Sequence, residues 1–265
     1  MEEELAMLIE SVEPFPNRFI PFFHVDPKTT SDLTPPRIEE ILAVTGDFVS
    51  FQGYGETAFY RHPWLCTNLT DPPWPEALAA MEENNLVVMI HLTSAQLPGF
   101  KAMLIERPGL TVLLHGPELV NELPELLKEH LNLYYTLDTA TTMFLDGPHP
   151  HPLMYPRSGG RTEFLAEYRA NRDTMLQSAL STWNPVLEAA PDRVMWGTDV
   201  SMGWHADAQV YEALMEFSNI FLENLPSALA RSYAFDNALR LFGAGMVVDP
   251  TSLDLLLGED SETDR

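Results

Sequence analysis

The chain has 265 residues, 45% of them hydrophobic, and it carries 39 acidic against 15 basic residues, for a net charge of −24. This length allows one α/β barrel or two small domains, and the acidity argues against nucleic acid and membranes as partners, because like charges repel. The single cysteine, Cys66, excludes an internal disulfide and a thiolate-rich metal site.

We expect neither a signal peptide nor a membrane-spanning helix. The first residues, MEEELAMLIE, are acidic where a signal peptide would be basic, and no run of about 18 apolar residues could span a membrane. We therefore expect a cytoplasmic protein. The last residues, GEDSETDR, lack apolar anchors, so we expect one domain over residues 1–257 and an acidic, flexible tail over residues 258–265.

Short apolar runs bounded by turn-forming residues recur along the chain and predict strands. They cover residues 18–25, 47–56, 86–93, 110–116, 131–139 and 193–200. Between them lie segments with apolar residues three and four apart, the spacing of an amphipathic helix. These segments are PPRIEEILAVTG, PPWPEALAAMEENN, LPGFKAMLIERPG and VNELPELLKEH. The alternation of strands and helices predicts a parallel sheet.

Two of the strand segments, LVVMI and LTVLL, are apolar throughout, as expected of strands covered on both faces. A barrel or a doubly wound sheet provides such cover. No glycine-rich phosphate loop follows the first strand, which disfavours a nucleotide-binding doubly wound sheet. We therefore expect an α/β fold of the (β/α)8 TIM-barrel type.

Four of the predicted strands end in a residue that can bind a metal: Glu56, His91, His115 and Asp199. In an α/β barrel the carboxyl ends of the strands share one face, which carries the active site. Imidazole and carboxylate together suit zinc, with manganese or iron as alternatives. Each residue also has a structural explanation, such as a hydrogen-bonded core histidine, a salt bridge for Glu56 or a helix N-cap for Asp199.

The segments PDRVMWGTDV, VVMIHLTS, TVLLHGPEL and YAFDNALRLFG resemble the amidohydrolase-2 branch of the amidohydrolase superfamily, over residues 17–243. That branch contains metal-dependent (β/α)8-barrel hydrolases and decarboxylases, including relatives of aminocarboxymuconate-semialdehyde decarboxylase. The resemblance implies that His91 is a metal ligand, that His115 polarises the substrate or water, and that Asp199 is a ligand or a base.

One feature of this family is absent. Its members open with a strand that carries a His-x-His pair of metal ligands, and nothing before Arg18 has this pattern. Three explanations remain open: a truncated reading frame, a non-catalytic relative, or a relative with a rearranged site. We expect a barrel that is incomplete or distorted, with a sheet edge that the amino-terminal segment, the long loop or a second copy of the chain in a homo-oligomer covers.

Other residues are weaker candidates for a site at the carboxyl ends of the strands. His149 and His151 stand in the long segment DGPHPHPLMYPRSGG and are extra ligand candidates, as is His24, although histidines in a solvated loop usually bind nothing. A substrate carboxylate would find a cation in Arg157 or His205. Among the aromatic residues, Trp204 is a candidate for an apolar substrate pocket.

The function expected from these residues is metal-dependent hydrolysis of a small-molecule amide, ester or lactone. Asp199 or His115 would handle the proton while the metal polarises the carbonyl. Decarboxylation at the same site is one alternative. The other is a non-catalytic barrel that acts as a binding or assembly protein, which the missing His-x-His pair favours.

Overall fold

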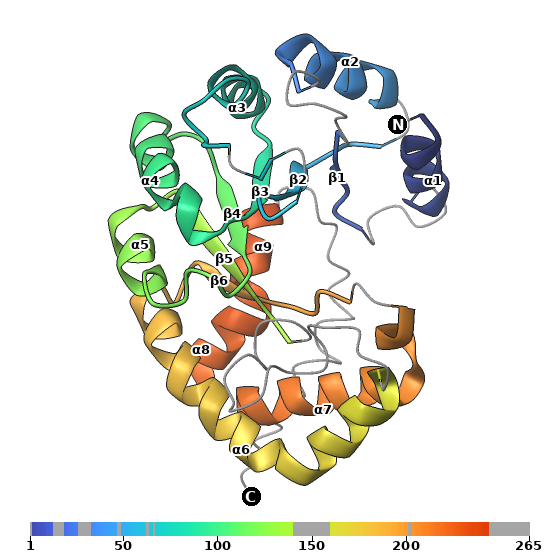
Figure 1. The fold of residues 1–265 in the computed structure, drawn as a ribbon, viewed down its shortest axis with the longest axis vertical. Coiled ribbons are helices and arrows are strands. Elements are labelled where there is room, and N and C mark those ends of the chain that lie inside the picture. The colour runs from blue at the N-terminus through green and yellow to red at the C-terminus, as the bar shows by residue number, and fades with distance from the viewer. Residues whose placement is uncertain are drawn as a thin grey trace, which may run out of the picture.

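The computed structural model describes residues 2–12, 19–25, 33–46, 49–61, 64–65, 67–139, 160–200 and 203–243. In these residues one parallel sheet forms, and each strand pairs with the next along the chain (Figure 1). Every strand overlaps one of the predicted apolar runs, so these strand predictions are confirmed. The strands are β1 (Phe22–Phe23), β2 (Gly53–Ala58), β3 (Val87–His91), β4 (Val112–His115), β5 (Leu133–Asp138) and β6 (Val194–Gly197).

Helices alternate with the strands, and the four predicted amphipathic segments form α2 to α5. Each of these four begins with proline in its first turn, where the missing N–H costs no helical hydrogen bond. None of the helices that the structure describes combines the length and the apolar character needed to cross a bilayer. The α-helices are α1 (Glu2–Val12), α2 (Pro35–Thr45), α3 (Trp74–Glu83), α4 (Leu97–Glu106), α5 (Leu123–Glu129), α6 (Gly160–Ala189), α7 (Ala208–Glu223), α8 (Ser227–Arg231) and α9 (Asn237–Phe242).

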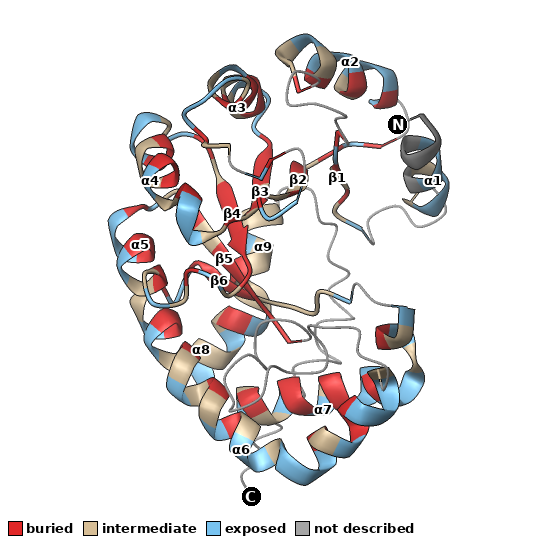
Figure 2. Ribbon diagram, viewed as in Figure 1, coloured by how far each residue is buried: buried red, intermediate tan, exposed pale blue. Residues whose placement is uncertain are grey.

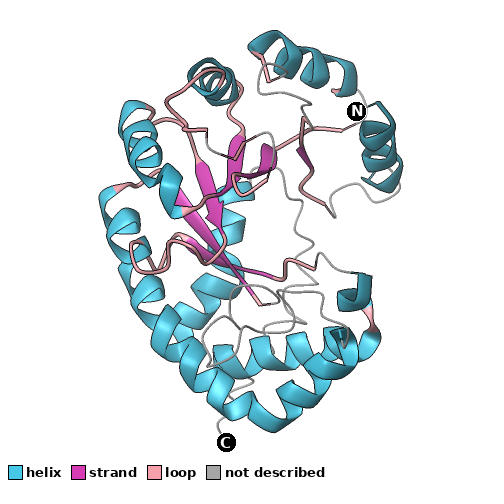
Figure 3. Cartoon of the chain, viewed as in Figure 1, coloured by secondary structure: helices cyan, strands magenta, loops and turns pink. Residues whose placement is uncertain are grey.

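Side chains alternate between the two faces of the sheet, as the pleat of a strand requires. On the outer face, Val88, Ile90 and Leu114 belong to the main hydrophobic core. The helices α3, α4 and α5 close this core and lie in succession along one side of the sheet (Figure 3). Figure 2 shows mostly buried strands, with the exposed residues gathered on the outer sides of the helices.

The inner face of the sheet forms a second, smaller cluster around Val87, Leu113 and Met195. The helix α9 packs against this cluster from the other side of the sheet through Ala238, Leu241 and Phe242 (Figure 1). The rings of Phe22 and Phe242 lie 6.0 Å apart, edge to face, so the last described helix contacts the first strand. We call this inner cluster and α9 the inner plug.

The sheet does not close into a ring in the described part of the chain, where β1 pairs only with β2 and β6 only with β5. The fold is TIM-barrel-like, as expected, and its parallel sheet is open among the residues that the structure describes. The domain bounds of 1–257 stay a prediction, because residues 244–265 lie outside the described part.

Candidate metal centre

Three predicted site residues meet at the carboxyl ends of neighbouring strands: Glu56 from β2, His91 from β3 and His115 from β4. The two histidines are register partners, and they follow the inward-facing Met89 and Leu113 by two residues, so both rings point to the inner face. One ligand atom from each of the three residues lies within 4.8 Å of the others. The sheet itself therefore brings these side chains together.

Glu56 lies between the two imidazoles. Its Oε1 atom is 3.2 Å from Nδ1 of His91 and 2.8 Å from Nε2 of His115. The His115 ring is 3% exposed, and its Nε2 atom has no hydrogen-bond partner of good geometry despite the short distance to Glu56. The contact between His115 and Glu56 is therefore mainly ionic. A buried nitrogen in this state is costly unless another group binds it.

A second carboxylate holds the far side of each imidazole. Nε2 of His91 is 2.7 Å from Oε2 of Glu118, and Nδ1 of His115 is 3.0 Å from Oδ2 of Asp138. Glu118 reaches His91 because the chain turns at Gly116, where φ is +93° and a Cβ atom would lie 2.3 Å from His91 Nε2. Both rings thus turn their remaining nitrogens toward Glu56.

The charges of this cluster shift one another's pKa values. Burial lowers the pKa of His115, but the hydrogen bond to Asp138 and the contact with Glu56 outweigh it and raise that pKa to about 10. Burial also opposes the charge of His91, whose pKa is nevertheless raised by Glu118 and Glu56. Burial raises the pKa of Glu56, and the two imidazoles reverse this and hold it well below its usual range. A cation that binds here must displace protons from the histidines.

Asp199 follows β6 and lies at the same end of the sheet. Its backbone has a φ of +45°, in the left-handed region that aspartate tolerates better than most residues. The pKa values of Tyr60 and Asp138 are raised, mainly by burial, and the Asp199 charge adds to both shifts. Asp199 is therefore near the centre, although it is not one of the three residues whose ligand atoms converge.

Trp204, His205 and His24 are not among the described residues whose ligand atoms converge. Trp204 and His205 contact each other in a short 3-10 helix, η3 (Gly203–Ala206), with ring centroids 4.4 Å apart, and His205 is buried. His24 is exposed and stacks on Tyr54 at 5.9 Å. The other three, His149, His151 and Arg157, fall outside the described residues.

Three further residues of the centre were not predicted from the sequence. Asp138 ends the predicted strand LNLYYTLDT, just as the four chosen residues end theirs, so the same rule could have found it. Glu118 stands in a loop, and nothing in its spacing indicates that it reaches His91. Tyr60 packs its ring edge-on against His91, with centroids 4.6 Å apart, and it also follows a strand end by two residues.

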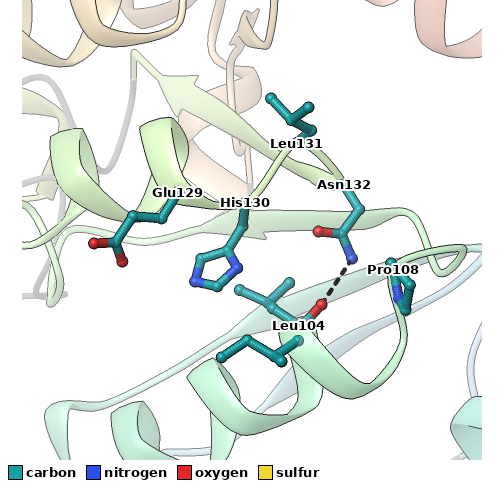
Figure 4. Close-up of a pocket in the computed structure, with 7 residues that line it drawn as sticks. Leu104, Pro108, Glu129, His130, Leu131 and Asn132 are labelled. Carbon is teal, nitrogen blue, oxygen red and sulfur yellow. Dashed lines mark hydrogen bonds between the residues drawn. The ribbon is translucent and has the colours of Figure 1, made fainter.

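A separate depression of about 460 Å³ lies at the opposite, amino end of the strands, between the end of α4 and the connection from α5 to β5 (Figure 4). Leu104, His130 and Leu131 line it, and the Asn132 amide there donates to the carbonyls of Arg107 and Leu110 at 2.9 and 3.0 Å. It lies at the other end of the sheet from the carboxyl-end cluster.

The cluster of Glu56, His91 and His115 fits a divalent ion. Two imidazoles and one carboxylate form a ligand set used by catalytic zinc, which keeps one position open. The buried Nε2 atom of His115 lacks a well-directed hydrogen bond, and a bound ion would give this nitrogen a partner. Carboxylates behind ligating imidazoles are a common feature of metal sites, and both histidines have one.

Comparison with known proteins gives the family. A family model described as Amidohydrolase, the amidohydrolase-2 model, matches residues 2–244. The chain belongs to the amidohydrolase-2 family. The match begins earlier than the resemblance seen in the sequence and includes α1. Amidohydrolases of this family usually bind a divalent metal.

Solved structures of similar fold include amidohydrolases and hydrolases. An amidohydrolase from Burkholderia multivorans with bound zinc has 15% identity and a TM-score of 0.63, over 92% of this chain and 80% of that one. A probable 2-pyrone-4,6-dicarboxylic acid hydrolase from Acinetobacter baumannii has 15% identity and a TM-score of 0.61, over 90% and 78%. A putative enzyme of the same name from Pseudomonas putida has 14% identity and a TM-score of 0.58, over 90% and 77%. Among curated proteins, none matches this sequence.

Proposed function

We propose that this protein is a metal-dependent hydrolase that acts on a small-molecule amide, ester or lactone. The observation that carries the proposal is the convergence of Glu56, His91 and His115, each from a different strand, with a carboxylate behind each histidine. Neither feature is needed to stabilise a barrel. Together they are what a catalytic metal site requires.

In this proposal Glu56, His91 and His115 hold the ion. The chemistry that a divalent ion supplies in such a site is polarisation of the substrate carbonyl and activation of water. His115 serves as a ligand and not as a base, because its Nδ1 is bound to Asp138 and its Nε2 faces Glu56. Proton transfer therefore falls to Asp199, which accepts a proton from the attacking water and returns it to the leaving group.

Tyr60 supplies a further group at the centre. Its side chain is exposed and its ring lies edge-on against His91, within reach of a substrate bound at the cluster. Burial and the nearby carboxylates raise its pKa, which keeps the hydroxyl protonated at neutral pH. We propose that this hydroxyl donates a hydrogen bond to the substrate.

The names of the structural relatives support zinc as the metal and a lactone or other ester as the bond that is hydrolysed. Zinc is bound in the Burkholderia multivorans amidohydrolase, so it is the first metal to test. Two relatives are named as 2-pyrone-4,6-dicarboxylic acid hydrolases, and a pyrone is a cyclic ester. Lactones therefore belong in the first set of substrates, beside amides and linear esters.

Metal binding is the first test. Purified protein is analysed for metal, stripped, and titrated with zinc and manganese by calorimetry. We expect one ion per chain, with a loss of affinity of more than about a hundredfold in His91→Ala and His115→Ala. His24→Ala is the matched control, because His24 lies outside the cluster and should bind the ion as the wild type does.

Activity is the second test. Zinc-loaded and stripped protein are assayed against panels of chromogenic amides, esters and lactones. We expect hydrolysis by the loaded protein alone, and a loss of about a hundredfold or more in Asp199→Asn with zinc still bound. If the wild type binds zinc no better than His91→Ala does, the non-catalytic interpretation replaces this proposal.

A further inference from the structure

We propose that Asp138 is a positioning residue that fixes the His115 ring, and that Gly197 exists to make room for it. Asp138 is the last residue of β5 and is 4% exposed. Its Oδ2 atom lies 3.0 Å from Nδ1 of His115, and its Oδ1 atom accepts a hydrogen bond from the Thr136 hydroxyl at 2.9 Å. Two side chains thus hold the carboxylate, one on each oxygen.

The pairing of β5 with β6 places Gly197 directly opposite Asp138. A Cβ atom on Gly197 would lie 2.1 Å from Oδ1 of Asp138 and 2.5 Å from the Thr136 hydroxyl oxygen, far inside van der Waals contact. Any side chain at this position must therefore displace the carboxylate. This explains why the apolar strand VMWG ends in glycine: the inward space of this residue is filled by a group from the neighbouring strand.

The consequence for His115 is orientation. An imidazole can rotate about its bond to Cβ, and either nitrogen can carry the proton when the ring is neutral. A carboxylate fixed at Nδ1 keeps a proton on that nitrogen and prevents the rotation. Nε2 is then left to face Glu56, at 2.8 Å. Asp138 therefore decides which His115 nitrogen is offered to the inner face.

The carboxylate behind His91 differs in its surroundings. Glu118 is 36% exposed in its side chain, so water competes for its hydrogen bond to His91. Asp138 has no such competition, and its position is set by three neighbouring residues of β4, β5 and β6. The stronger control of orientation is therefore expected at His115.

The effect on metal affinity rests on the proposed function, whereas the orientation of His115 does not. Two measurements test the orientation and the metal affinity separately. The first is the NMR signal of the His115 Nδ1 proton, assigned by its loss in His115→Gln and recorded for metal-free and zinc-loaded protein. The second is zinc affinity, measured by competition with a chromophoric chelator.

The test variants are Asp138→Asn and Gly197→Ala. The first removes the negative charge at nearly constant shape, and the second adds one methyl group without touching His115. We expect both to shift or broaden the Nδ1 proton signal and to weaken zinc binding by about 10-fold to 100-fold. Gly203→Ala is the matched control, because a Cβ atom there meets nothing within 4 Å and should change neither measurement.

A double variant distinguishes positioning from general damage to the fold. In an Asp138→Ala background, the carboxylate that Gly197→Ala displaces is already gone. The added methyl group still meets Thr136, which is not one of the candidate ligands. We therefore expect Gly197→Ala to cause no further loss of zinc affinity there, whereas independent damage would add its full effect. The melting temperature of each variant shows that the comparison is made on folded protein.

The results that overturn the proposal are equally specific. If Gly197→Ala and Asp138→Asn keep the wild-type Nδ1 proton signal, Asp138 does not position His115. If the signal changes in both variants while wild-type protein binds no zinc, the positioning holds and the proposed metal-dependent function fails. If zinc affinity in both stays within about threefold of wild type although the signal changes, the role assigned to the Nε2 atom is wrong.

Discussion

The two ends of the sheet bury polar side chains in different ways. At the amino end, Arg193 donates to the carbonyls of His130 and Leu133, and Asn237 donates to those of Pro191 and Val194. At the carboxyl end, the side chains of the cluster bind one another. Polar side chains at the amino end therefore form hydrogen bonds with backbone carbonyls and fix the loops. Those of the cluster at the carboxyl end pair with one another and concentrate charge.

The histidines show the same difference. Burial lowers the pKa of His130, at the amino end, and no carboxylate contacts it closely enough to reverse this shift. At the carboxyl end the carboxylates outweigh burial and raise the pKa values of His91 and His115. The surroundings thus favour the neutral form of histidine at the amino end and the charged form at the carboxyl end.

The largest expected effect is on stability at the amino end. Arg193→Met removes the donor of two carbonyl hydrogen bonds at a residue that is 7% exposed. We expect the free energy of unfolding to fall by about 3 kcal/mol, because the carbonyls lose their partners in a buried place. Denaturant unfolding measures this.

The matched control is Arg169→Met, on the exposed side of α6, which should change stability by less than about 0.5 kcal/mol. Zinc affinity of Arg193→Met should equal that of the wild type, since Arg193 lies at the other end of the sheet. A marked loss of zinc affinity in this variant would show that the two ends are not independent.

A smaller effect is expected from pH at the carboxyl end. The pKa of His115 is raised to about 10 in the folded state and is about 6.5 in an unfolded chain. Its stabilising charge is therefore fully present below pH of about 6.5 and is lost as pH rises toward 10. We expect the free energy of unfolding of metal-free protein to fall over that range.

Melting curves of metal-free protein between pH 6.5 and 10 measure this loss, and His115→Gln should flatten it. His130 has the opposite sign, because its lowered pKa disfavours the charged form. His130→Gln should therefore leave the alkaline branch unchanged and reduce only the loss of stability below pH of about 6.5. If His115→Gln still loses stability between pH 6.5 and 10 as the wild type does, a group other than His115 causes the loss.

The smallest expected effect compares the two histidines within the centre. Glu118 is partly exposed, so Glu118→Gln should weaken zinc binding by less than about tenfold, which is less than we expect for Asp138→Asn. Chelator competition at low and high salt measures both. The Glu118 effect should shrink in salt, whereas that of the buried Asp138 should persist. Equal losses of zinc affinity in the two variants would show that Asp138 controls His115 no more strongly than Glu118 controls His91.

Much of the fold could be predicted because the strand and helix patterns are local. The runs that became β3 and β4 are short and apolar throughout, and the segments that became α3 and α4 carry proline at their start and apolar residues at helical spacing. Their alternation fixes a parallel sheet. From this, the convergence of Glu56, His91 and His115 follows, since each stands at or near a carboxyl end.

What could not be predicted depends on contacts between distant segments. The approach of Glu118 to His91 depends on the backbone angle at Gly116, and the role of Gly197 depends on the register of β5 with β6. The apolar residues of α9 fit any apolar face, so their spacing does not indicate that they pack on the inside of the sheet. Asp138 is a different case, since the strand-end rule covers it and was not applied.

The inner plug has a consequence for how the protein is made. Its helix, α9, is the last element described, and it covers the inner face formed by strands β1, β3, β4 and β6. During synthesis from the amino terminus, that apolar face is complete before its cover has left the ribosome. The contact between Phe22 and Phe242 joins residues from opposite ends of the described chain, and such contacts form slowly. We therefore expect an interval during synthesis in which this apolar face is exposed, and in which a chaperone would limit aggregation.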